Sequence, residues 1–132
     1  MNRKKTILLV DDDAYFRFAM ATELRVAGFI VQSAHDGDRA LQMLEDMAGL
    51  DSDIDIVITD LVMPRKDGFR FSTELRESYR DIPILVITGH LTEEAERELR
   101  ILGRIQFLEK PFTPGELLSR VEGMISGNSE CS

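Results

Sequence analysis

Apolar and β-branched residues gather in short, unbroken runs that recur along the chain. Four runs have the length and composition of strands that are buried on both faces of a sheet. They span residues 6–10, 54–59, 84–87 and 105–108. A fifth segment, residues 29–34, alternates apolar and polar side chains and suits the edge of a sheet. The pattern therefore predicts five strands.

Between these runs, apolar residues recur at the spacing of amphipathic helices. The first stripe contains Phe16, Met20, Leu24 and Ala27, and Gly28 follows it where a helix commonly ends. The later stripes are Ala40, Leu41, Leu44 and Ala48; Phe71 and Leu75; Ala95, Leu99 and Leu102; and Leu117, Leu118, Val121 and Ile125. The chain is thus expected to form five helices that alternate with the five strands.

Start signals support these helices. Asp13, Asp36 and Thr92 are expected N-caps, and Asp67 with Gly68 opens the third helix. The last helix has the strongest signal, because residues 113–116 read Thr-Pro-Gly-Glu. This sequence places proline at the first helical position and completes a Thr-x-x-Glu capping box.

Regular alternation of strands and helices predicts an open, doubly wound α/β domain. Its sheet is parallel, covered by helices on both faces and joined by right-handed connections. In such sheets the functional site lies beyond the carboxyl ends of the strands. These ends are therefore the place to look for chemistry.

Composition limits the setting and the partners. The 132 residues include 24 acidic and 16 basic side chains, for a net charge of -8. This charge argues against nucleic acid as a direct partner, since lysine and arginine supply most affinity for phosphate backbones. The only cysteine, Cys131, can form no disulfide within the chain, which favours a cytoplasmic location. The first apolar run is too short for a signal peptide or a membrane span, so no membrane contact is expected.

Chemically useful side chains stand at the end of each central strand. Asp11, Asp12 and Asp13 follow the first strand, Asp60 the third, Thr88 the fourth and Lys110 the fifth. A fold that brings these ends together would place the carboxylates of Asp11, Asp12 and Asp60 side by side, which is costly without a cation. Oxygen ligands of this kind suit Mg²⁺, or Mn²⁺, with open positions for a phosphate. A carboxylate in such a site can act as a nucleophile and form an aspartyl phosphate.

The residues at these positions resemble the receiver domains of two-component response regulators. The resemblance covers residues 5–126 and leaves 127–132 as a flexible tail. It rests on Ile-Leu-Leu-Val-Asp-Asp at 7–12, Thr-Asp-Leu-Val-Met-Pro at 59–64 with Asp-Gly at 67–68, Ile-Thr-Gly at 87–89 and Lys-Pro-Phe at 110–112. It implies a flavodoxin-like fold with strand order 2-1-3-4-5.

The same resemblance implies a role for each site residue. Asp60 is the expected phosphoacceptor, and a sensor histidine kinase or a histidine phosphotransfer protein is the expected donor. Mg²⁺ would be bound by Asp12, Asp60 and the backbone carbonyl of Val62, with Asp11 acting through water. Thr88 and Lys110 would hold the phosphoryl oxygens.

The resemblance also implies a switch and an output surface. Phe107 stands at the aromatic switch position and is expected to move with Thr88. The surface formed by the fourth helix, the fifth strand and the fifth helix would then change for an unknown downstream protein or effector domain, or for a second copy of the chain. The protein would be a regulator that assists only its own phosphorylation and dephosphorylation. A free-standing receiver and a piece of a longer regulator fit the sequence equally well.

The chain departs from the family pattern at several points. Phe107 has no hydroxyl group, and Gly103-Arg104 replaces the usual Gly-Ala before the fifth strand. Val62 and His90 occupy the two positions that influence the attacking water. Since neither is a carboxylate or an amide, slow self-dephosphorylation is expected.

Other functions fit the sequence less well. A haloacid-dehalogenase-like phosphotransferase would use Asp11 as its nucleophile and Asp13 as its acid/base, but Asp13 is better explained as a helix cap. A flavin-binding module would need a loop after the first strand that accepts phosphate, where the aspartates would repel it. The complete set of five site residues argues against a receiver that has lost its phosphate chemistry.

Overall fold

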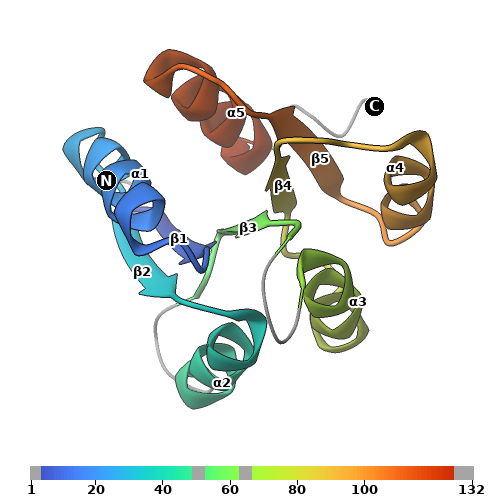
Figure 1. Ribbon diagram of the computed structural model, residues 1–132. Helices are drawn as coiled ribbons and strands as arrows, with labels where there is room; N and C mark the ends of the chain where they lie inside the picture. The colour runs from blue at the N-terminus through green and yellow to red at the C-terminus, as the bar shows by residue number, and fades with distance from the viewer. Residues whose placement is uncertain (1–3, 49–52, 63–66, 127–132) are drawn as a thin grey trace.

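The computed structural model describes residues 4–48, 53–62 and 67–126 of the chain. Five strands and five helices alternate from β1 to α5 (Figure 1). They are β1 (Thr6–Val10), α1 (Ala14–Val26), β2 (Ile30–Ala34), α2 (Gly37–Met47), β3 (Ile56–Asp60), α3 (Gly68–Ser78), β4 (Ile84–Thr88), α4 (Glu93–Arg100), β5 (Ile105–Glu109) and α5 (Pro114–Ser126). The expected tail at 127–132 and most of the expected loop at 49–53 lie outside the described residues.

The strands form one parallel sheet in the order β2-β1-β3-β4-β5. This confirms the predicted doubly wound α/β architecture. Helices α1 and α5 cover one face of the sheet, while α2, α3 and α4 lie on the other (Figure 1). The order of the strands reverses at β1, so the ends of β1 and β3 are the point where a site is expected.

Both faces of the sheet are buried, which explains the unbroken apolar runs. In β1, Ile7 and Leu9 belong to the core beneath α1 and α5, whereas Leu8 and Val10 belong to the core beneath α2, α3 and α4. Side chains in a strand alternate between the faces, so a strand with two buried faces needs apolar residues throughout. Edge strand β2 has exposed positions, as its mixed pattern predicted.

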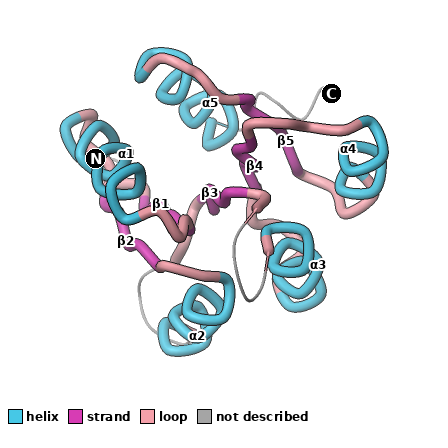
Figure 2. The backbone as a smooth tube through the Cα atoms, viewed as in Figure 1, coloured by secondary structure: helices cyan, strands magenta, loops and turns pink. Residues whose placement is uncertain are grey.

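All expected helix starts are confirmed by hydrogen bonds. Side-chain oxygens of Asp13, Asp36, Asp67, Thr92 and Thr113 accept from backbone N–H groups in the first turn of the helix that follows. The capping box is reciprocal, since the Thr113 N–H also donates to Glu116 Oε1 at 2.7 Å. Each helix therefore begins at the edge where the preceding strand ends (Figure 2). We call this edge of the sheet the carboxyl edge.

The boundaries differ from the prediction where local turns intervene. Three residues, Ala27, Ala48 and Leu102, lie outside the helices to which their spacing assigned them. Helix α4 ends at Arg100 because Gly103 and Arg104 both adopt positive φ, at 81° and 53°, in the turn before β5. Strand β3 starts at Ile56 rather than at residue 54. The side chain of Asp55, just before it, accepts a hydrogen bond from the Thr6 N–H at 2.8 Å. Each of these corrections shifts a boundary by a few residues.

The start of α3 packs unusually close to the end of β3. The Gly68 N–H donates to the carbonyl oxygen of Leu61 at 2.8 Å. A Cβ atom at residue 68 would overlap the carbonyl oxygen of Asp60 and lie 2.7 Å from the Cα of Leu61. Both neighbours are backbone atoms, so only glycine fits between α3 and the end of β3.

Within the described residues, none of the helices has the length and apolar character needed to cross a bilayer.

We predict that Gly68→Ala destabilises the fold by about 1–3 kcal/mol, because the backbone at the end of β3 must move to admit the methyl group. The free energy of unfolding from urea titration measures the loss. The matched control is Gly123→Ala in α5, where a Cβ meets no atom within 4 Å. It should be neutral or stabilising by about 0.5–1 kcal/mol. Equal effects of the two substitutions would contradict the packing argument.

Candidate functional site

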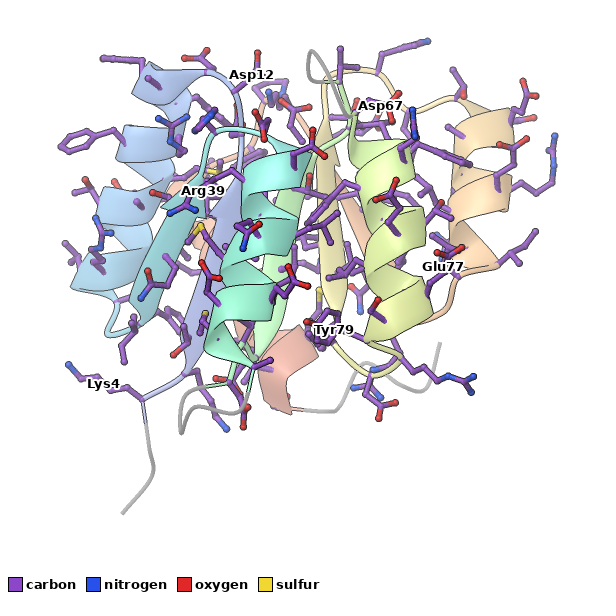
Figure 3. All side chains as sticks on the ribbon, turned by 90° about the horizontal axis from the view of Figure 1, so that it is seen from below. Lys4, Asp12, Arg39, Asp67, Glu77 and Tyr79 are labelled. Atoms are coloured by element: carbon purple, nitrogen blue, oxygen red, sulfur yellow. The ribbon has the colours of Figure 1, made fainter. Side chains whose placement is uncertain are left out.

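The carboxyl edge gathers the side chains predicted for the site. Asp11 directly follows β1, Asp60 and Thr88 are the last residues of β3 and β4, and Lys110 follows β5. Asp12 lies at this end of the molecule together with Asp67, whereas Lys4 and Tyr79 lie at the opposite end (Figure 3).

Asp60 is held by two neighbours. Its Oδ2 atom lies 3.1 Å from the Nζ of Lys110, and its Oδ1 atom accepts a hydrogen bond from the Val62 N–H at 3.1 Å. The Asp60 side chain is 11% exposed and that of Lys110 is 33% exposed. The two contacts therefore fix the orientation of the carboxylate, which keeps a small exposed fraction.

Asp11 is fully buried and only partly satisfied. Its Oδ1 atom accepts from the Asp13 N–H at 2.8 Å, but its Oδ2 atom has no hydrogen-bond partner among the described residues. The pKa of Asp11 is raised from 3.8 to about 6, chiefly by burial and in addition by the nearby charges of Asp60 and Asp12. The Asp13 N–H and Lys110 act in the opposite direction, lowering this pKa. A negative charge on Asp11 is thus costly in the protein alone.

The site fits a hard divalent cation. Carboxylate oxygens of Asp11, Asp12 and Asp60 lie within 4.8 Å of one another. Oxygen donors from carboxylates are the ligands that Mg²⁺ and Mn²⁺ prefer. A cation would offset the repulsion within the cluster and satisfy the buried oxygen of Asp11 that lacks a partner. Val62, the fourth expected ligand through its carbonyl group, is an exposed residue two positions after Asp60.

Thr88 is buried, and its hydroxyl group is bound to the loop that follows β4. The oxygen accepts from the His90 N–H at 3.2 Å, and the hydroxyl donates to the His90 carbonyl at 3.3 Å. The Lys110 N–H donates to the Thr88 carbonyl at 2.9 Å, which aligns the ends of β4 and β5. The backbone thus brings Thr88 beside Lys110, while its hydroxyl group faces His90.

Phe107 is half-buried on β5, between groups from α4 and α5. The guanidinium of Arg100 lies 5.0 Å from the centre of its ring, and Arg120 donates to its carbonyl oxygen at 2.6 Å. The peptide bond between Lys110 and Pro111 is cis.

One contact of the site was not predicted from the sequence. The Lys110 Nζ lies 4.4 Å from the centre of the Phe16 ring, so α1 contributes to the surroundings of the ammonium group. The helical spacing explained Phe16 as a core residue and gave no reason to look further. Its place in the first turn after Asp13, where α1 begins at the carboxyl edge, is the signal that could have revealed it.

Comparison with known proteins gives a consistent result. The family model described as "Response regulator receiver domain" matches residues 7–122. The chain is 33% identical over 120 residues to the sensor kinase CckA of Brucella abortus, covering 91% of this chain and 12% of the relative. It is 35% identical over 120 residues to the transcriptional regulatory protein CpxR of Escherichia coli, covering 90% of this chain and 48% of the relative. The chain therefore spans about half or less of the length of these relatives.

Solved structures share the fold. The chemotaxis protein CheY4 of Vibrio cholerae aligns with a TM-score of 0.84 and 31% identity, covering 92% of this chain and 99% of the other. The receiver domain of the hybrid histidine kinase CckA aligns with a TM-score of 0.75 and 31% identity, covering 91% and 98%.

We predict that Asp11→Asn stabilises the cation-free protein by about 1–3 kcal/mol at pH 7.5. The pKa of Asp11 is raised from 3.8 to about 6 in the folded state, so ionisation of this carboxyl group lowers stability as the pH rises from about 4 to about 6. Above that range the loss is complete and stays constant. Asparagine can still accept from the Asp13 N–H. Urea titrations at pH 7.5 and pH 4, with and without Mg²⁺, measure the difference.

The stabilisation should shrink at pH 4, where Asp11 is largely protonated, and it should also shrink with Mg²⁺ if the ion binds wild type more tightly than the variant. Asp12→Asn is the matched control and should change stability less, because Asp12 is exposed. An Asp11→Asn variant that is less stable than wild type at pH 7.5 without Mg²⁺ would refute this account of the buried carboxylate.

Proposed function

Because the chain belongs to the response regulator receiver domain family of two-component systems, we propose that Asp60 accepts a phosphoryl group from a histidine of a partner protein. One observation carries the proposal. The Asp60 carboxylate is fixed between Lys110 and the Val62 N–H, next to the unsatisfied oxygen of Asp11. A nucleophile, a cation and a place for a metal ion thus share one edge of the sheet.

The transfer has a simple balance of bonds. A carboxylate oxygen of Asp60 attacks the phosphorus of the phosphohistidine, and the bond between phosphorus and nitrogen breaks. The imidazole nitrogen keeps the electron pair and takes up a proton from solvent, while Asp60 becomes an acyl phosphate. Lys110, which already touches Asp60, donates hydrogen bonds to phosphoryl oxygens and offsets their charge.

Acidic residues of the site would hold the cofactor. Mg²⁺, or Mn²⁺, would be bound by Asp12, Asp60 and the Val62 carbonyl, with Asp11 acting through water. When bound, the ion would supply positive charge for the phosphoryl oxygens. Residues 5–126 would then form the complete receiver unit.

Phosphorylation would be read out at the surface of α4, β5 and α5. The Thr88 hydroxyl would leave His90 and bind a phosphoryl oxygen, and Phe107 would repack as Thr88 moves. Support comes from Phe107 itself, which is half-buried between Arg100 and Arg120, and from the 82% exposed Ile101 just after α4. A downstream protein, an effector domain or a second copy of the chain would bind this surface.

The donor would be a sensor histidine kinase or a histidine phosphotransfer protein. The relatives include a sensor kinase and a transcriptional regulatory protein, and in both the match covers only a part of the relative. The chain would act as a regulator within such a relay. A haloacid-dehalogenase-like reaction at Asp11 is not favoured, because the carboxylate of Asp13 caps α1 through the N–H groups of Tyr15 and Phe16.

We predict that acetyl phosphate with Mg²⁺ adds one phosphoryl group to the wild-type chain and none to Asp60→Asn. Intact-mass spectrometry followed by peptide mapping measures the addition and its position. Asp67→Asn is the matched control, because asparagine also caps helices well and the residue lies at the same edge. It should be phosphorylated as wild type is.

Two outcomes would contradict this assignment. Phosphate on Asp60→Asn would place the acceptor elsewhere, and turnover of a phosphate ester by that variant would favour an enzyme that uses Asp11.

We predict that the aspartyl phosphate persists for minutes or longer. The side chain of Val62 is 73% exposed but has no polar atom to orient an attacking water. Loss of label from radiolabelled protein measures the lifetime. Val62→Asn should shorten this lifetime. Ile101→Asn is the matched control, because it makes a similar change at an exposed residue just after α4, and it should leave the lifetime unchanged. A wild-type lifetime of seconds to tens of seconds would refute the prediction.

A further inference from the structure

The ammonium group of Lys110 has two neighbours of different chemistry. Asp60 Oδ2 lies 3.1 Å from Nζ, and the centre of the Phe16 ring lies 4.4 Å from it. The first contact is an ion pair with the proposed phosphoacceptor. The second brings a cation close to an aromatic ring, well within the range of a cation–π interaction.

The ring of Phe16 is itself held in place. Phe16 lies in the first turn of α1, where its N–H donates to Asp13 Oδ1 at 3.2 Å. Its ring packs edge-on against Phe112, with the ring centres 6.1 Å apart and the planes at 69°. Both rings pack against the core between the sheet and helices α1 and α5. The backbone cap and the second ring therefore fix the surface on which the ammonium rests.

An aromatic ring suits this position for an electrostatic reason. It attracts the cation through its quadrupole but carries no net charge. A carboxylate in the same place would neutralise Lys110, whereas an aliphatic side chain would leave the ammonium held by Asp60 alone. A lysine side chain is long and flexible, and this one is a third exposed, so a second contact restricts it at little electrostatic cost.

We propose that Phe16 is a positioning residue for Lys110, holding its ammonium group where it meets the incoming phosphoryl group. The inference rests on the proposed function of Asp60. The ring leaves N–H donors of Lys110 available for phosphoryl oxygens, and it keeps the lysine in place when the charge on Asp60 is redistributed by the transfer.

The test compares substitutions of Phe16 in the full chain. With acetyl phosphate and saturating Mg²⁺, Phe16→Leu should be phosphorylated about three- to tenfold more slowly than wild type. Phe16→Tyr keeps the ring and should stay within about twofold of wild type. Phe29→Leu is the control for packing, since Phe29 is a half-buried phenylalanine on the same core but directly precedes β2, at the edge of the sheet opposite Lys110. It should leave the rate unchanged.

A second measurement needs no phosphate. In the proton NMR spectrum of wild type, the ring current of Phe16 should shift the ε-methylene protons of Lys110 upfield. Phe16→Leu should abolish the shift, whereas Phe16→Tyr and Phe29→Leu should keep it. If Phe16 acted only through packing, loss of the upfield shift and loss of the phosphorylation rate would not occur in the same variants.

The outcomes separate this inference from the function on which it rests. A wild-type chain that takes up no phosphate overturns the proposed function, and with it any role of Phe16 in that function. If wild type is phosphorylated but Phe16→Leu reacts at the same rate, or if Phe16→Tyr is as slow as Phe16→Leu, the role of Phe16 alone is refuted. Absence of the upfield shift in wild type refutes it as well.

Discussion

Repulsion among the carboxylates of Asp11, Asp12 and Asp60 is the constraint on which the rest of the site depends. Parallel strands β1 and β3 end side by side, so their terminal aspartates are placed together by the hydrogen bonds of the sheet. The protein alone relieves this repulsion only in part. Lys110 pairs with Asp60, and backbone N–H groups bind one oxygen each of Asp11 and Asp60. What remains is a site that gains stability by taking up positive charge.

That arrangement links folding to binding. The apolar residues of the two cores must hold the aspartates together against their repulsion, and the rigid sheet allows them little freedom to separate. In a more flexible sheet the carboxylates would move apart, and a cation would then offset less repulsion. The cost to stability and the gain that a bound cation would bring thus have one origin, in the fixed spacing of β1 and β3.

The sequence predicted the fold well because its signals are local. Strand runs that are apolar throughout require two covered faces, and each N-cap acts on N–H groups two or three residues away. The strand-end positions of Asp11, Asp60, Thr88 and Lys110 followed from the same patterns. The contact between Phe16 and Lys110 did not, since it joins residues far apart in the chain, and helical spacing assigns Phe16 only to a face. The fit of Gly68 against Asp60 and the binding of the Thr88 hydroxyl to His90 likewise depend on the packed backbone.

The common starting edge of the five helices has a consequence for handling the protein. Strand β1 runs toward the site, and Lys4 before it lies at the end of the molecule opposite Asp12 (Figure 3). Helix α5 begins at the carboxyl edge and runs away from it to Ser126. A linker, an affinity tag or a solid support joined at Lys4 or at Ser126 would therefore start from the edge opposite the proposed phosphoacceptor. Orientation of the immobilised protein, with its acidic site toward the solution, is then a property of the topology itself.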